Sequence, residues 1–399
     1  MKKIIYTALS GIPSDNSGGP NKVINQIISK IDLTKYRTYY LSKNSYNEIN
    51  NLLFPFSSLK EIKNNLTTSL FSKSILYQKI FTSSTYLKYF FNQSIDKISK
   101  HLNNEEWDII HSHDVRCLFG IKQKKSKIVL SIHSKGSIIN DMAQLYGYRN
   151  SLLNIYNDFK HNEIKTLEIS DAVTFPSQAA LELFFRDIKN DSFIPKVKVV
   201  YNGMDIEKIN QIKIDKNFLA KWKWLENYDN RIVTVASHIK VKNIDKILMV
   251  LYELNKMKLG KYFLISIGSG PLTKYLKKLA FDLKVSEYVL FIDFLQNDEI
   301  LKLMKFCNIY ISLSERVIFD LVILEALACG MNVFASDDGG NREIIDNSNG
   351  YLIKENNIRN IAELIFNSKL DYSTKAKDSV KKFDIMNVVN NYVKLYDEN

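Results

Sequence analysis

The sequence contains little cysteine, and its cysteines show no Cys-x-x-Cys spacing. Cys117, Cys307 and Cys329 are far apart in a chain of 399 residues. This pattern gives no support to a zinc site and is typical of reduced, buried thiols in a cytosolic protein. No apolar run approaches the ~18 residues that a membrane-spanning helix needs. The start, MKKIIYTAL, has an apolar segment too short for a secretion signal and predicts a first buried strand instead.

The chain also lacks any long block of lysine or arginine and any fixed-period internal repeat. Its net charge is nevertheless +12, from 55 basic and 43 acidic side chains. Such a balance suits phosphates, anionic lipid or nucleic acid. Because the basic residues are dispersed and no nucleic-acid motif is present, we do not expect a nucleic-acid partner.

Short apolar runs alternate with amphipathic segments through most of the chain, which predicts an α/β fold. Helical periodicity covers 22–31, 154–169, 244–257 and 272–283. Because strand and helix alternate twice in series, we expect two doubly wound domains, each with a parallel sheet covered on both faces. The expected strands lie in KKIIYTAL, WDIIHSH, SKIVLSIH, DAVTFPS and VKVVYNG, and then in RIVTVAS, YFLISIG, YVLFIDF, IYISLS and MNVFAS.

The pattern weakens after YNGMDIEKI, so we place the domain boundary near residue 212, with a first domain at 1–212 and a second at 213–378. Ligands of such sheets bind beyond the carboxyl ends of the strands. Paired domains of this kind therefore predict a site in a central cleft between them.

Residues 52–102 depart from the alternation because seven lysines are interleaved with Phe, Leu, Ile and Tyr. A basic amphipathic surface of this kind can lie on an anionic membrane. A pair of ordinary surface helices explains the same pattern, and the sequence leaves both interpretations open.

Several residues at expected strand ends could carry chemistry. Gly18 and Gly19 precede Pro20, which suits the first turn of a helix whose N-terminus favours an anion. His133 ends a strand and is a candidate hydrogen-bonding or acid–base group. His111 and His113 also end a strand, where backbone-satisfied structural histidines are the simpler explanation. The three histidines lack the acidic cluster that a metal site would add.

A second group of candidates lies in the second series of strands. Lys242, at a strand-to-helix junction, could neutralise a diphosphate. Gly268 begins a tight turn in IGSGP that lacks the full dinucleotide-binding pattern. Glu325 lies inside an apolar helix, where a carboxylate needs partners such as ribose hydroxyls. Structural lysines and a structural buried acid are the alternatives.

Taken in order, these motifs resemble a retaining glycosyltransferase of family 4 with the GT-B fold, of the surface-polysaccharide type. The resemblance spans nearly the whole chain. The terminal segment 379–399, with KKFDIMNVVNNYVKLYDE, resembles the last helix of that family, which packs back on the first domain. The motifs are SGGP, HSHD, SIHS, FPSQAALELF, VVYNGMD, KNI, IGSGPL, LVILEALACG, GGNREII and NGYLI.

The resemblance implies a role for each matching residue. Gly18 and Gly19 would approach the donor phosphate and sugar, and His133 would contact a hydroxyl of the reacting sugar. Lys242 would bind the diphosphate, and Glu325, the second acid of an E-x7-E pattern, would hold the ribose. The remaining expected donor contacts are Ser237, Gly268, Phe319 and the backbone amides of Leu321 and Val322. Members of this family usually need no metal or other cofactor.

The sequence departs from the family pattern at three places. Val317 replaces the first acid of E-x7-E, Ser237 replaces an arginine, and a Gly-Phe-Gly segment has become Ile318, Phe319 and Asp320. Loss of a charged hydrogen bond costs roughly 1.5–3 kcal/mol. We hypothesise that Asp320 or Glu315 supplies the missing carboxylate, with Asp320 in a catalytic role, and that Lys240 or His238 assists at the diphosphate.

These observations predict an enzyme that transfers a hexosyl unit from a nucleotide sugar, with a UDP-sugar as the first candidate, to a cell-surface or lipid-linked glycan. It would be cytoplasmic or peripheral on the inner face of the membrane. A non-catalytic GT-B protein that stabilises an active transferase is the alternative, which Val317 and Ser237 favour. A nucleotide-sugar epimerase or a phosphorylase is a further alternative, but the acids and the pyridoxal lysine motif expected for these are not found.

Overall fold

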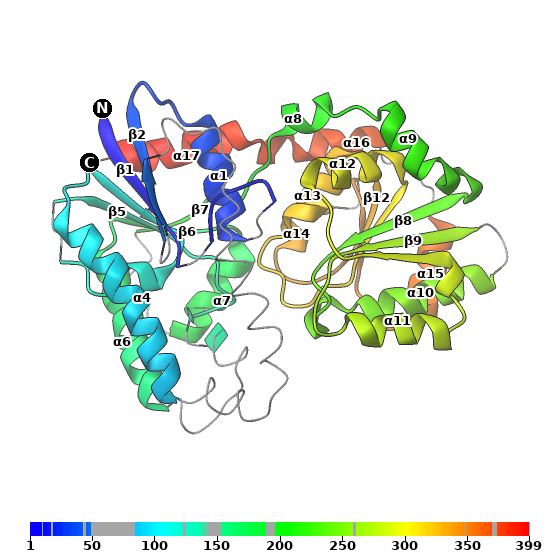
Figure 1. Cartoon of the computed structure of the whole chain (residues 1–399), viewed down its shortest axis with the longest axis horizontal. Coiled ribbons are helices and arrows are strands. Elements are labelled where there is room, and N and C mark those ends of the chain that lie inside the picture. Colours follow the sequence, from blue (N-terminus) through cyan, green and yellow to red (C-terminus); the bar gives the residue numbers. More distant parts are fainter. Residues whose placement is uncertain are drawn as a thin grey trace. The chain divides into compact units, whose positions relative to one another are not determined.

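The computed structural model divides the chain into two compact units (Figure 1). Unit 1 comprises Met1–Pro176, Leu181–Val200 and Asn391–Asn399, and unit 2 comprises Ser177–Ala180 and Tyr201–Asn390. The residues described are 1–9, 11–16, 19–42, 45–48, 84–122, 125–138, 140–141, 153–188, 196–257, 261–346, 348–368 and 373–398.

Unit 1 contains a seven-stranded sheet in the order β3-β2-β1-β4-β5-β6-β7. Every pairing is parallel except that of β2 with β3. The strand order reverses between β1 and β4, so the carboxyl ends of these strands form the switch point where ligands of doubly wound sheets bind. The strands are β1 (Lys2–Thr7), β2 (Tyr36–Ser42), β3 (Ser45–Glu48), β4 (Ile109–Ser112), β5 (Lys127–Ser131), β6 (Ala172–Phe175) and β7 (Val197–Val199).

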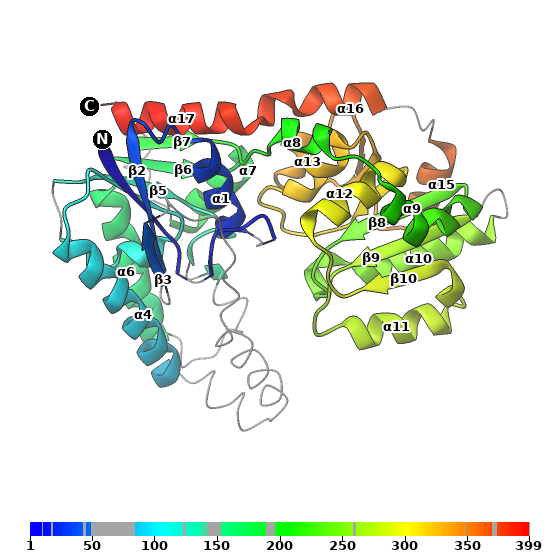
Figure 2. The ribbon, with the colours of Figure 1, turned by 45° about the horizontal axis from the view of Figure 1, so that its top comes forward.

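The central strands of unit 1 are buried along their whole length, since all four residues of β4 and of β6 are buried. Strands without an exposed face require helices on both sides of the sheet. Helices α4 and α6 run side by side in both views (Figures 1 and 2). The helices with residues in unit 1 are α1 (Pro20–Lys30), α4 (Ser84–Asn104), α6 (Leu153–Ile169), α7 (Gln178–Ile188) and the end of α17 (Ile385–Asp397).

Unit 2 contains a six-stranded, all-parallel sheet in the order β10-β9-β8-β11-β12-β13. Its order reverses between β8 and β11, which places a second switch point there. The strands are β8 (Asn230–Val235), β9 (Tyr262–Ile267), β10 (Val289–Ile292), β11 (Ile309–Ser312), β12 (Asn332–Ser336) and β13 (Tyr351–Ile353).

Two hydrophobic clusters cover the two faces of the sheet in unit 2. Neighbouring residues of one strand contribute to different clusters, as Val233 and Ile232 of β8 do, because side chains alternate along a strand. One cluster receives α10 (Ile244–Lys256), α11 (Thr273–Asp282) and α15 (Ile358–Asn367). The other receives α8 (Ile206–Gln211), α9 (Lys216–Trp222), α12 (Asn297–Phe306), α13 (Leu321–Ala328), α14 (Asn341–Ile344) and α16 (Ser373–Ser379).

The predicted fold class of two doubly wound α/β domains is confirmed, and all ten predicted strands form. The units divide between Val200 and Tyr201, whereas the sequence places the boundary near 212. The difference arises because the segment after Val200 packs on unit 2. The Tyr201 ring lies 5.3 Å from that of Phe383, and the Met204 N–H donates to the Phe383 carbonyl at 3.0 Å.

The terminal helix α17 starts in unit 2, and its last residues belong to unit 1. Within unit 1, the Tyr396 hydroxyl lies 2.6 Å from His111 Nδ1, and the Tyr392 hydroxyl lies 3.1 Å from Ser131 Oγ. Ser131 Oγ also lies 2.8 Å from His111 Nε2. Burial lowers the pKa of His111 to about 3. His111 is therefore a neutral, fully hydrogen-bonded residue that ties the terminal helix to strands β4 and β5.

The predicted membrane surface at 52–102 can be followed only in part. Residues 52–83 lie outside the described residues, and 84–102 belong to α4. No helix in the described part of the chain combines the length and apolarity needed to cross a membrane.

Candidate functional site

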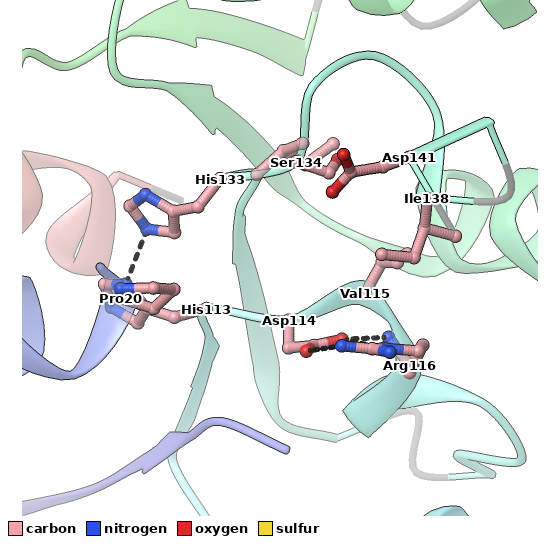
Figure 3. Close-up of a pocket in the computed structure, with 10 residues that line it drawn as sticks. Pro20, His113, Asp114, Val115, Arg116, His133, Ser134, Ile138 and Asp141 are labelled. Atoms are coloured by element: carbon pink, nitrogen blue, oxygen red, sulfur yellow. Dashed lines mark hydrogen bonds and ion pairs between the residues drawn. The ribbon is translucent and has the colours of Figure 1, made fainter. Parts of the chain in front are cut away.

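A hollow of about 180 Å³ lies at the carboxyl ends of β4 and β5 in unit 1. It therefore occupies the switch-point edge of that sheet. Figure 3 shows its polar side chains, which come from the segments directly after the two strands. The lining residues are Pro20, His113, Asp114, Val115, Arg116, Ile132, His133, Ser134, Ile138 and Asp141.

His133 and His113 form a direct pair in this hollow. His113 Nδ1 lies 3.0 Å from His133 Nε2, and the two rings are parallel to within 8°. Burial lowers the pKa of His133 to about 4, partly offset by the Asp114 carboxylate, and lowers that of His113 well below its ordinary value. Both rings are neutral near pH 7, so His133 can exchange hydrogen bonds without carrying charge.

Asp114 and Arg116 form a second pair, which the sequence reasoning did not select. Arg116 Nε and Nη2 donate to the two carboxylate oxygens of Asp114 at 2.9 and 2.6 Å. Asp114 also accepts from the Arg116 N–H and so caps the 3₁₀ turn Val115–Leu118. The bidentate contact compensates the guanidinium charge within the pocket wall. This pair could have been suspected from the sequence, because an acid and an arginine follow directly after the strand that ends in HSH.

Two acids hold the loop that follows His133. Ser137 N–H donates to Asp187 Oδ2 at 3.0 Å, and Ile138 N–H donates to Glu163 Oε1 at 2.8 Å. Gly136 has φ +87, and a Cβ there would lie 2.1 Å from Asp187 Oδ2, so only glycine fits. Burial raises the pKa of Glu163 to about 8. Neither acid was selected from sequence, since each lies on a helix far along the chain from the loop it holds.

The glycine turn before α1 can be placed in part. Gly19 has φ +57 and precedes α1, whose first residue, Pro20, lines the hollow. A Cβ at Gly19 would meet nothing within 4 Å, so this backbone borders open space. Gly18 lies outside the described residues.

In unit 2, the loops after β8 and β9 pack backbone against backbone. A Cβ at Gly268 would lie 2.1 Å from the Ala236 carbonyl oxygen, and one at Gly270 would lie 2.6 Å from that of His238. His238 N–H donates to the Ser269 carbonyl at 3.1 Å. The glycines of IGSGP therefore allow close contact between the loops that follow β8 and β9.

His238 is not available for the assisting role at the diphosphate that we expected. Its ring is fully buried, with Nδ1 2.8 Å from Thr273 Oγ1 and Nε2 3.2 Å from Ser266 Oγ. Burial lowers its pKa. A neutral ring with both nitrogens already paired cannot offer a charged donor to a ligand, and that expectation was wrong.

Ser237 is exposed and Lys242 partly exposed, both after β8. Lys240 and Lys242 lie on a 3₁₀ turn that ends at Asn243, a non-glycine residue with φ +49. The Asn243 side chain donates to the Leu313 carbonyl and to Glu315 Oε1, both at 2.8 Å. This cross-link joins the lysine turn to the loop after β11, which carries the altered E-x7-E segment.

The segment that carries Val317 is held by the following DDGG loop. Val317 N–H donates to Asp338 Oδ1 at 2.7 Å, and Gly340 N–H donates to the Val317 carbonyl at 3.1 Å. A Cβ at Gly339 would fall 1.9 Å from the same carbonyl oxygen. The N–H and carbonyl groups of Val317 are therefore held by the Asp338 carboxylate and the Gly340 N–H, and neither contact involves the side chain at 317.

The two acids considered as substitutes for a glutamate at 317 already have partners. Asp320 Oδ1 accepts from the Val322 N–H at 3.0 Å and caps α13. Glu315 accepts from Asn243 and Lys246, and hydrogen bonds from both lower its pKa. The Val322 amide that we expected to cradle a phosphate is thus occupied by Asp320.

Phe319 precedes α13 in the sequence, and Glu325 lies within this helix. The Phe319 ring packs 5.8 Å from Tyr201 and 5.5 Å from Phe383. Glu325 is 5% exposed, and Asn297 Nδ2 of α12 donates to its Oε1 at 3.3 Å. Leu321 is partly buried and opens α13. In unit 2, Lys242, Gly268 and Asp320 thus belong to the segments that follow β8, β9 and β11, and Glu325 lies in α13, about one helix turn after its first residue.

Two doubly wound α/β units of this kind are the architecture of the GT-B fold. The family model for glycosyl transferases group 1 matches residues 217–379, and that for glycosyltransferase family 4 matches residues 74–208. The chain belongs to the family 4 glycosyltransferases.

Relatives of known sequence agree with this assignment. The chain is 29% identical to the glycosyltransferase MJ1069 of Methanocaldococcus jannaschii over 57% of this chain and 58% of that one. It is 25% identical to the N-acetyl-alpha-D-glucosaminyl L-malate synthase of Bacillus anthracis over 75% and 77%, respectively. The match thus spans little more than half the length of the archaeal relative.

Solved structures share the fold at low identity. WaaG, a glycosyltransferase involved in lipopolysaccharide biosynthesis, superposes with a TM-score of 0.68 at 15% identity, covering 99% of this chain and 100% of its own. Anabaena Alr3699/HepE in complex with UDP gives a TM-score of 0.66 at 17% identity and 99% coverage of both chains.

Proposed function

We propose that this glycosyltransferase moves a hexosyl unit from a nucleotide sugar, with UDP-sugars as the first candidates, to a hydroxyl group of a cell-surface or lipid-linked glycan. The proposal rests chiefly on unit 2, where Lys242 and Glu325 lie in the segments that follow the two switch-point strands, β8 and β11. A fixed cation is what the leaving nucleotide diphosphate requires. HepE, a structural neighbour, has been solved with UDP and with UDP-glucose.

We propose that the reaction retains the anomeric configuration through attack on the same face that the diphosphate leaves. The leaving diphosphate would take the proton of the acceptor hydroxyl. No carboxylate nucleophile is then needed, and Lys242 would stabilise the charge that grows on the leaving group. His133, neutral and partly exposed at its strand end, would hold a hydroxyl of the donor sugar. No step requires a metal.

Asp320 does not serve as the catalytic acid in this proposal. Its carboxylate accepts from the Val322 N–H and stands at the N-terminus of α13. A carboxylate at a helix N-terminus is stabilised by the helix dipole and repels a second anion brought to the same place. We therefore assign Asp320 to shaping of the donor site.

Turnover with a panel of UDP-, GDP-, ADP- and CDP-sugars tests the proposal, with release of the free nucleotide as the readout. Lys242→Ala should lower turnover about 10- to 100-fold, as expected for loss of a charged hydrogen bond. Lys278→Ala, which removes an exposed lysine of α11 in the same unit, is the matched control and should leave turnover unchanged.

The NMR coupling of the product's anomeric proton then decides the stereochemistry. An α-linked product from an α-linked donor supports retention, and a β-linked product contradicts it. No release of nucleotide from any donor, by a folded protein, would favour the alternative of a non-catalytic stabilising partner.

For the acceptor, we propose a lipid-linked glycan at an anionic membrane surface that residues 52–102 would contact, given the lysines in that segment. Vesicles with anionic lipid should sediment the protein at low salt, and high salt or neutral vesicles should release it. Sedimentation that is equal under all three conditions would contradict an electrostatic contact.

A further inference from the structure

The ring of His113 has a single hydrogen-bonding contact in the described part of unit 1, and that contact is His133. Nδ1 of His113 lies 3.0 Å from Nε2 of His133. Nε2 of His113 is buried and has no hydrogen-bond partner among the described residues. The residue itself is held in place, because its N–H donates to the Thr7 carbonyl at 2.8 Å and its ring centroid lies 4.3 Å from that of His111.

The two rings together carry two N–H protons on four ring nitrogens, and the contact between them can hold only one of these protons. A neutral imidazole carries one N–H and one bare nitrogen. Burial keeps both rings neutral near pH 7, as the lowered pKa values of both indicate. The contact between Nδ1 and Nε2 therefore holds a single proton, and the tautomer of one ring fixes the tautomer of the other.

Two arrangements satisfy this contact. In the first, His113 donates from Nδ1, and the proton of His133 lies on its own Nδ1. In the second, His133 donates from Nε2, and the proton of His113 lies on its buried Nε2, where no described residue accepts it. Buried N–H groups without an acceptor are rarer in native structures than acceptors that are incompletely satisfied. The first arrangement is therefore favoured.

We propose that His113 is a positioning residue that donates its only ring proton to His133 and so holds the proton of His133 on Nδ1. In Figure 3 the second ring nitrogen of His133 lies on the side away from His113. His133 would then offer an N–H at the hollow that it lines, suited to an oxygen atom such as that of a sugar hydroxyl. The role of this N–H in binding a sugar hydroxyl rests on the proposed function. The position of the proton on Nδ1 of His133 does not.

Two substitutions of His113, by asparagine and by aspartate, test whether the residue must donate a hydrogen bond to His133. The two side chains have nearly the same shape, but only asparagine can donate. His113→Asn keeps an N–H that can donate to His133 Nε2, whereas the carboxylate of His113→Asp can only accept from it. The ring nitrogens of His133 are read by ¹⁵N NMR on histidine-labelled protein, with His133→Gln to assign the signals. His238→Gln removes a buried histidine of unit 2 and is the control that should leave the His133 signals unchanged.

We expect the wild-type protein and His113→Asn to carry the proton of His133 on Nδ1, and His113→Asp to carry it on Nε2. Turnover with the accepted donor should fall about tenfold or more in His113→Asp relative to His113→Asn, mainly in kcat, as for a misplaced hydrogen-bond donor. The proposal is overturned if wild-type His133 carries its proton on Nε2, or if the Asn and Asp variants show the same tautomer and turnover. Should His113→Asp not fold, the wild-type spectrum alone decides, even if no donor is turned over.

Discussion

The two units share a doubly wound topology but stabilise their switch-point loops by different means. Unit 1 uses buried and partly buried ionisable side chains: His133 pairs with His113, Asp114 with Arg116, and Glu163 and Asp187 hold backbone amides. Unit 2 also holds backbone amides with Asp320 and Asp338, but in addition it packs glycine backbones against neighbouring carbonyl oxygens. Side chains that titrate make a site sensitive to pH, whereas close backbone contacts make it sensitive to added volume. We therefore expect unit 1 to lose stability mainly with changes of pH, and unit 2 mainly with substitutions that add volume at its glycines.

The largest expected effect is that of a methyl group in unit 2. Gly268→Ala would place Cβ 2.1 Å from the Ala236 carbonyl oxygen at φ +131, so the loops after β8 and β9 must separate. We expect unit 2 to lose about 3 kcal/mol or more of stability and to lose donor binding.

Gly19→Ala in unit 1 is the matched control for that change. Its φ is +57, but nothing lies within 4 Å of the new Cβ. Its cost should therefore be about 1–3 kcal/mol, from a backbone conformation with φ +57 and ψ −139 that favours glycine. Thermal unfolding of both variants measures the difference, and equal losses would contradict the contrast between the two units.

The second prediction concerns pH and unit 1. His111 and His133 are neutral in the folded state, with pKa values of about 3 and 4, so stability should fall as pH drops below about 6.5, where the unfolded chain takes up protons. Glu163 has a raised pKa of about 8, so it is protonated in the fold, and stability should fall as pH rises from about 4.5 toward 8.

Glu163→Gln isolates the second of these effects. A glutamine keeps an oxygen that can accept from the Ile138 N–H but has no proton to lose. The drop in Tm between pH 5.5 and 8.5 should therefore become smaller in the variant, as measured by calorimetry at both pH values. An unchanged drop would show that another group causes the alkaline loss.

A smaller effect is expected for His238 in unit 2. His238→Leu leaves Thr273 and Ser266 without their ring partner, so stability should fall by about 1–3 kcal/mol. Because neither ring nitrogen is available to a ligand, the dissociation constant of the donor should stay within about twofold. A large loss of donor affinity at unchanged stability, measured by titration calorimetry, would restore His238 to the diphosphate site.

The smallest expected effect on stability is that of Asp320→Asn. Asparagine caps helices about as well as aspartate, so Tm should hardly change. Removal of a negative charge from the N-terminus of α13 should tighten the binding of a nucleotide diphosphate by several-fold. Weaker binding would indicate instead that the carboxylate takes part in donor recognition.

The sequence predicted the elements that depend on buried apolar runs and missed those that depend on contacts far along the chain. All ten predicted strands form, because each is a short apolar run with polar or glycine ends. Strands β2, β3 and β13 were not predicted. In β2, YRTYYLS lacks a continuous aliphatic run.

The residues of the candidate site also fall into those that the sequence predicted and those that it missed. Strand ends placed His133 at the hollow of unit 1 and Lys242 after β8 in unit 2, since the carboxyl ends of parallel strands share one edge. The support from Glu163 and Asp187 depends on which helix faces meet the strand ends. The pairing of His113 with His133 depends on the directions in which their side chains leave two neighbouring strand ends. The hydrophobic periodicity of one segment does not predict such contacts between elements that are distant in the sequence. His238 was misjudged for the same reason, because its neighbours Ser266 and Thr273 come from the next strand and helix.

Whether unit 2 binds a nucleotide sugar is the central claim, and a thermal-shift panel against UDP-, GDP-, ADP- and CDP-sugars tests it most directly. A ligand at 100 times its dissociation constant adds about 2.7 kcal/mol of stability, a shift of roughly 5–11 °C for a unit of this size. We predict such a shift with one nucleotide series and its loss in Glu325→Ala, whose carboxylate would hold the ribose. No shift with any nucleotide sugar, by a protein that unfolds cooperatively, would contradict the account.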